Sequence, residues 1–155
     1  MLGRPRALHH QEWEKPVTLT TECTTGDELA ENLLRGIGNE QMRAATRLLG
    51  AHRDGYWLRR FLDDRELAEA VNQPCQFIDR ADTSPSVDWN AVALVLVTQP
   101  WVLKCSGSEQ AVLEFAASLV GKTSVNLHKA INAADEDEFE RMLRAMRQAA
   151  YGDVA

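Results

Sequence analysis

From residue 25 onward, hydrophobic residues recur every three or four positions, which is the spacing of amphipathic α-helices. The first stripe holds Leu29, Leu33 and Ile37, and glycines at 36 and 38 are expected to end that helix. The same spacing predicts further helices that begin near Asn39, Asp54, Asp63, Ser106, Val125 and Asp135. The pattern therefore predicts a chain of short helices.

Polar residues mark the expected helix starts. Three pairs have the spacing of a capping box, in which a side-chain oxygen accepts from an early backbone N–H and a carboxylate reaches back. These pairs are Thr25 with Glu28, Asp63 with Glu66, and Ser106 with Glu109. We also expect Asn39 and Asp54 to cap the helices that follow them.

Three segments are harder to assign from the pattern. The apolar run 91–97 fits a buried helix or a buried strand, and a cap at Ser86 or Asp88 favours the helix. Residues 17–22 and 101–104 allow short strands, which would make the fold α+β. The stretch 81–86 reads as a loop.

The last predicted helix carries the clearest stripe, formed by Phe139, Leu143, Met146 and Ala150. Acidic residues occupy its first turn and arginines follow, in the order that the helix dipole favours. We predict that the stripe faces the core. The expected core comprises Trp57, Phe61, Trp89, the 91–97 run, Phe115, Leu119, Leu143 and Met146. Trp101 is expected in the core or at its rim.

These patterns predict a predominantly all-α fold, a single compact domain of six or seven short helices over residues 25–152. Residues 1–24 lack helical periodicity and are expected to form an extended arm, in which Trp13 is a candidate anchor. A length of 155 residues fits one domain with a substantial core.

Composition narrows the class of protein. A hydrophobic fraction of 45% and a charged fraction of 26% are those of globular domains, and no apolar run is long enough to cross a membrane. Residues 1–10 lack the apolar segment of a secretory signal, so we expect a cytoplasmic protein. The three cysteines are widely spaced and odd in number, which predicts free thiols.

No motif points to a catalytic or metal site. Residues 116–123 fit a loose phosphate-loop pattern, but a helix is expected to end at Gly121, where its dipole disfavours phosphate. His52 and His128 stand alone, and a lone histidine is usually a surface or interface residue. We therefore predict no enzyme, no metal site and no cofactor, with a catalytic group assembled only in space as the remaining alternative.

Charge is distributed unevenly along the chain. The net charge is −6, yet residues 35–60 hold six arginines and only two acids. From this region we predict a basic binding patch for a protein or nucleic acid, formed by Arg43, Arg47, Arg53, Tyr56, Arg59 and Arg60. We predict an acidic face at the start of the last helix, formed by Asp135, Glu136, Asp137 and Glu138.

The leading functional hypothesis from these features is a non-enzymatic protein-interaction or regulatory accessory module with a basic and an acidic face. The first alternative is a nucleic-acid-binding regulator that uses Arg43, Arg47, Arg59 and Arg60. A small enzyme is the third. Another protein is the expected partner, no membrane is expected, and two complementary faces also allow self-association.

Overall fold

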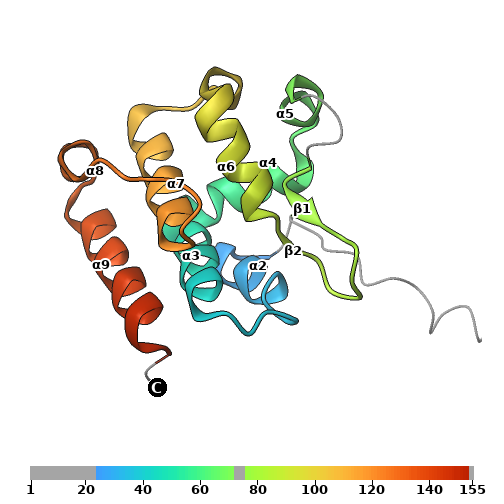
Figure 1. Ribbon diagram of the computed structural model, residues 1–155, viewed down its shortest axis with the longest axis horizontal. Helices are drawn as coiled ribbons and strands as arrows, with labels where there is room; N and C mark the ends of the chain where they lie inside the picture. The colour runs from blue at the N-terminus through green and yellow to red at the C-terminus, as the bar shows by residue number, and fades with distance from the viewer. Residues whose placement is uncertain (1–23, 72–75, 154–155) are drawn as a thin grey trace, which may run out of the picture.

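The computed structural model describes residues 24–71 and 76–153, and its elements carry the labels of Figure 1. The predicted all-α class is confirmed, because helices dominate and the β-structure of the described residues is one two-stranded sheet. No helix in these two ranges combines the length and the apolar character that crossing a bilayer demands. The predicted strand at 17–22, and all but the last residue of the predicted arm, lie outside the described residues.

The elements follow one another with short connections. The α-helices are α2 (Gly26–Asn32), α3 (Glu40–Ala51), α4 (Tyr56–Asp63), α5 (Arg65–Ala70), α6 (Trp89–Thr98), α7 (Gly107–Leu119), α8 (Leu127–Ala133) and α9 (Glu136–Tyr151). Two 3₁₀ turns, η1 (His52–Asp54) and η2 (Pro100–Leu103), join them, together with strands β1 (Ile78–Asp79) and β2 (Ser86–Val87). The strands pair antiparallel, with Ile78 opposite Val87.

Helix α3 is the centre of the packing. It contacts α2, α7, α9 and α4, and Ala44, Ala45, Leu48 and Leu49 are all buried. The small side chains at 44 and 45 allow neighbouring helices to approach closely, while the leucines fill the space between them. Figure 1 shows α8 and α9 at one edge of the molecule, and α5 and the β-hairpin at the other.

Most of the predicted helix starts are confirmed. Both hydrogen bonds of the capping box form at Thr25 and at Ser106, and the side chain of Asn39 accepts a hydrogen bond from the backbone N–H of Met42. Asp88 caps α6, so the apolar run 91–97 is a helix, as its cap favoured.

Three predictions about local structure are wrong. Asp64, one residue after the predicted cap, accepts from the backbone N–H of Leu67 and starts α5. Residues 101–103 complete a 3₁₀ turn instead of a strand, since Pro100 at its start sets a helical φ, and Lys104 follows the turn with a left-handed backbone. Trp101, expected in the core or at its rim, is 72% exposed on this turn.

The turn before α4 has an unusual backbone. Arg53, Asp54 and Gly55 have φ angles of 47°, 52° and 79°, and the first two are strained because they carry side chains. The prediction that Asp54 caps α4 is also wrong, because Gly55 occupies the N-cap position and no side chain caps this helix. Oδ1 of Asp54 accepts from the N–H of Gly26 at 2.8 Å, so it ties this turn to the start of α2.

Glycines allow α2, α3 and this turn to meet at backbone distance. A Cβ on Gly26 would lie 2.2 Å from the carbonyl oxygen of Gly50 and 2.4 Å from the nitrogen of Gly55. A Cβ on Gly50 would lie 2.7 Å from the Cβ of Ala30. Real side chains do not fit at such distances, so the crossing requires glycine at 26 and 50.

We therefore expect Gly26→Ala to lower the free energy of unfolding by roughly 3 kcal/mol, because the added methyl overlaps backbone atoms that cannot move aside. Gly107→Ala is the matched control: it lies in the first turn of α7 with no atom within 4 Å of the added Cβ. Its expected change is within about 0.5 kcal/mol. Urea unfolding followed by circular dichroism measures both, and equal effects would contradict the close crossing.

Candidate functional site

Helix α9 turns a different face to the core than its sequence predicts. Leu143 and Met146, expected in the core, are 43% and 46% exposed, and Phe139 of the same stripe is 38% exposed. The line that packs inward consists of Glu138, Met142 and Ala145. Each of these residues directly precedes one of the stripe, a rotation of about 100° around the helix. The prediction that the stripe lies in the core is therefore wrong.

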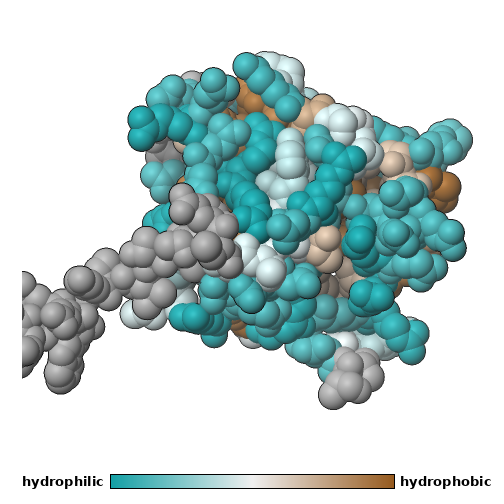
Figure 2. All heavy atoms as spheres, turned by 180° about the vertical axis from the view of Figure 1, so that it is seen from behind, coloured by the Kyte–Doolittle hydropathy of each residue, from teal (hydrophilic) through white to brown (hydrophobic). Residues whose placement is uncertain are grey.

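The stripe forms one wall of an apolar groove between α8 and α9. Leu127 and Ile131 of α8, 59% and 57% exposed, form the opposite wall. Phe115, Ala130 and Met142 complete the lining of this groove of about 230 Å³, whose residues are all apolar. Figure 2 shows apolar side chains at the surface along the edge of the molecule where α8 lies, among largely hydrophilic neighbours.

Charged residues border the stripe on its solvent side. Glu140 and Arg147 are exposed and lie one helical position beyond Phe139 and Met146, respectively. Residues 140 and 147 are seven positions apart, so they lie on one face of the helix, nearly two turns from each other. The guanidinium of Arg147 lies 5.9 Å from the ring centre of Tyr151. The groove is thus bordered by an acid near one end of α9 and a base near the other.

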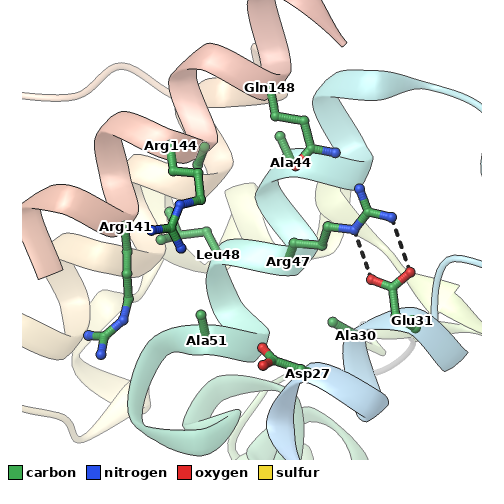
Figure 3. Close-up of a pocket in the computed structure, with 11 residues that line it drawn as sticks. Asp27, Ala30, Glu31, Ala44, Arg47, Leu48, Ala51, Arg141, Arg144 and Gln148 are labelled. Atoms are coloured by element: carbon green, nitrogen blue, oxygen red, sulfur yellow. Dashed lines mark hydrogen bonds and ion pairs between the residues drawn. The ribbon is translucent and has the colours of Figure 1, made fainter. Parts of the chain in front are cut away.

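The opposite side of α9 faces a charged cleft of about 240 Å³ between α2, α3 and α9 (Figure 3). Arg47 of α3 donates to Glu31 at 2.8 Å and to Asp153 at 3.0 Å. The hydrogen bond from Arg47 lowers the pKa of Glu31 below its ordinary value. These ion pairs join α2 and the residues after α9 to the central helix.

The rest of the cleft is lined by α9 and by small apolar residues. Figure 3 shows Arg144 extending from α9 toward α3, whereas the guanidinium of Arg141 lies farther from Arg47. The Nε2 atom of Gln148 is buried without a hydrogen-bond partner among the described residues. The cleft therefore offers donors to an anion, but its central arginine is already held by two carboxylates.

His52 and Glu138 form a buried pair that the sequence analysis missed. Nδ1 of His52 and Oε1 of Glu138 share a hydrogen bond, and their side chains are only 2% and 9% exposed. Arg141 adds an ion pair to the other carboxylate oxygen at 3.6 Å. His52 was predicted at a surface or an interface, and it lies in the core instead. No sequence signal joins two residues 86 positions apart.

A histidine–carboxylate pair is a common unit of acid–base catalysis, but this one is closed to substrate. Neither residue lines the apolar groove or the charged cleft. Nε2 of His52 is buried and makes no hydrogen bond within the described part of the chain. The neighbouring ring of Tyr56 stands edge-on, 6.3 Å from the imidazole. The pair therefore links η1 to α9.

Two of the predicted basic residues lie on α3 and bind α2, the segment between α2 and α3, and the residues after α9. Arg43 donates to the backbone carbonyls of Leu34 and Ile37, at 3.3 and 2.9 Å. Arg47 binds the carboxylates of the charged cleft, as described above. Both guanidiniums are thus engaged within the chain.

The other predicted basic residues bind around α4. Arg53 pairs with Glu109, Arg59 donates to the carbonyl of Thr24 at 2.6 Å, and Arg60 pairs with Asp64 at 2.8 Å. Arg60 also lies over the ring of Tyr56, with 5.8 Å to its centre. The structure places these arginines against different elements: the start of α7, the residues before α2, and the start of α5.

The predicted acidic face divides in two. Asp135 caps α9 by accepting from the backbone of Glu138 at 2.8 Å, and Glu136 and Asp137 are exposed beside it. Glu138 is 7% exposed and points to His52, so it does not belong to the exposed acidic surface.

The other features considered in the sequence are the 116–123 segment, the cysteines and possible metal ligands. Gly121 has a φ of 78° just after α7, and Lys122 donates to the carbonyl of Ala117 at 3.2 Å, so this segment is a helix end, as predicted. Cys105 is a free thiol, and partial burial raises its pKa. The described residues contain no group of three or more histidine, cysteine or acidic side chains placed to hold a metal ion.

The function of this chain has to be inferred from its own structure. No family model, no curated protein and no solved structure matches this chain.

We expect His52 and Glu138 to be coupled in their effect on the free energy of unfolding. Replacing either partner by leucine leaves a buried polar atom of the other without its hydrogen bond, so His52→Leu and Glu138→Leu should each cost about 3 kcal/mol in the free energy of unfolding. The double variant removes both polar groups and should recover most of that loss. Urea unfolding of the four proteins measures the coupling, and additive losses would contradict a linked pair.

Proposed function

We propose that this chain is a non-enzymatic protein-binding module whose contact surface is the groove between α8 and α9. The observation that carries the proposal is the set of large apolar side chains around this groove. Leu127, Ile131, Leu143 and Met146 are each between 43% and 59% exposed, and Phe139 is 38% exposed. Large exposed apolar side chains that gather in one patch with a polar rim are typical of interaction sites.

The shape of the surface favours a helical partner. Two helices with a groove between them present ridges and a channel into which the side chains of a third helix fit, at about 8–10 Å between axes. A helix in such a groove uses apolar anchors that recur every three or four residues. The proposed partner is therefore an amphipathic helix.

The border of the groove adds a charge requirement. Glu140 favours a basic residue on the partner and Arg147 favours an acidic one, both just outside the apolar stripe. Exposed ion pairs contribute little affinity, so this border selects orientation and register more than it adds to binding strength. The partner helix needs one basic and one acidic position on the same side of its stripe.

Nucleic-acid binding and catalysis are less well supported by the contacts of the described residues. A nucleic-acid surface needs arginines that are available to phosphate, and the predicted ones are engaged with carboxylates and carbonyls of this chain. An enzyme needs reactive groups that a substrate reaches, and the histidine–carboxylate pair is buried. Both therefore rank below protein binding, and we retain the cytoplasm as the proposed location.

A designed peptide tests the groove directly. The probe is a fluorescently labelled amphipathic helix with leucines at the stripe positions, one lysine and one glutamate at the border positions, and alanine elsewhere. Fluorescence anisotropy follows its binding to the full chain as the protein concentration rises from nanomolar to 100 μM, about the range that a single groove of this kind covers.

We expect Leu143→Glu to weaken peptide binding at least about tenfold, because it places a charge in the centre of the apolar wall. Leu94→Glu is the matched control, since Leu94 is an exposed leucine of α6, 54% accessible and outside the groove lining. It should bind the peptide like the unmodified chain. If the peptide binds all three proteins equally, or binds none of them at concentrations where the chain is a monomer, the proposal fails.

A further inference from the structure

We infer that the helix which fills this groove is α9 of a second copy of the chain, lying antiparallel to the first. This inference rests on the proposed function and names its partner. The outer face of α9 has the features that the groove requires: an apolar stripe of Phe139, Leu143, Met146 and Ala150, and charged residues along its border.

The spacing of the stripe fits a pair of helices. Its intervals of four, three and four residues are those of the a and d positions of a coiled-coil seam. In an antiparallel pair, each a position meets a d position of the other helix. This places Leu143 against Met146 of the other copy, two side chains of similar size, and the large Phe139 against the small Ala150.

The charges agree with the same register. Between these two layers, position 140 of one helix lies next to position 147 of the other. Glu140 of each copy then faces Arg147 of its neighbour, and twofold symmetry makes this pair twice. A parallel pair would leave Glu140 and Arg147 seven positions apart along the two helices, so these two charges would not meet. The sequence of α9, acidic at its start and basic further along, thus favours the antiparallel orientation.

Helix α8 enlarges the contact beyond a two-helix seam. Leu127 and Ile131 stand beside the stripe and would cover the flank of the incoming helix. Four helices, two from each copy, would then enclose one apolar centre with a charged border, which is the usual layout of a protein interface. The segment 1–23 of the same chain is a weaker candidate, because its hydrophobic residues do not recur at helical spacing.

The mass of the full chain in solution tests the inference. Sedimentation equilibrium from about 1 to 200 μM gives the dissociation constant of the pair, over the range expected for a small interface. We expect a concentration-dependent dimer, a monomer for Leu143→Glu, and a dimer for the matched control Leu94→Glu. A chain that stays monomeric to 200 μM overturns the inference, as does a dimer that Leu143→Glu leaves intact.

A charge exchange tests the orientation and register. Glu140→Lys and Arg147→Glu alone each place like charges together at two symmetric points, and should raise the dissociation constant by roughly tenfold. The double variant restores opposite charges and should return most of the affinity. Single losses that the double variant does not recover overturn the antiparallel register.

A monomeric chain that still binds the designed peptide through Leu143 overturns the second copy as partner and supports the groove as a helix-binding site. A chain that neither pairs nor binds the peptide overturns both. Loss of pairing on removal of residues 1–23, with the groove variants without effect, overturns the assignment to α9.

Discussion

The structure depends on the burial of α3, which has neighbours on nearly every side. Helices α2, α7 and α9 all pack against it, and its small residues at 44, 45 and 50 set how closely they approach. A central helix of this kind fixes the positions of elements far apart in the chain, because each is placed relative to the same axis. The groove between α8 and α9 exists because α9 is held on α3 by one line of residues and keeps a second line outside.

Helix α9 therefore serves two surfaces at once. Met142 and Ala145 bury against the body, Glu138 is stabilised there by His52, and the adjacent apolar stripe faces outward. A helix that only completed a core would place polar residues where Phe139 and Leu143 stand. One helix thus has a buried line against the body and a separate apolar line that faces outward, and this outward apolar line is the reason to assign binding to this face rather than to the arginines.

How much the sequence predicts depends on how local the signal is. The caps at Thr25, Asn39 and Ser106 were predicted, because a cap involves residues three positions apart. The stripe of α9 was also identified, but its direction was not, since two neighbouring lines satisfy the same period. The inner line includes Glu138, which no pattern predicts as buried without knowledge of His52.

The basic cluster shows the same limit. Six residues close in sequence indicated one patch, whereas the structure directs them to partners as distant as Glu109 and Asp153. Which arginine meets which acid is a property of the fold, and charge counts along the chain do not contain it. The groove needed the same long-range information, since α7, α8 and α9 all contribute to its lining.

The glycine crossing has a consequence for the ancestry of this chain. Positions 26, 50 and 55 meet at distances that exclude a methyl group. A substitution at any of the three glycines would therefore disturb the crossing, whereas most surface positions tolerate substitution. A distant relative with the same helix arrangement would keep these three glycines, which lie 24 and five positions apart in this chain, after other resemblance had faded. That triplet is a signature of descent that backbone geometry itself preserves.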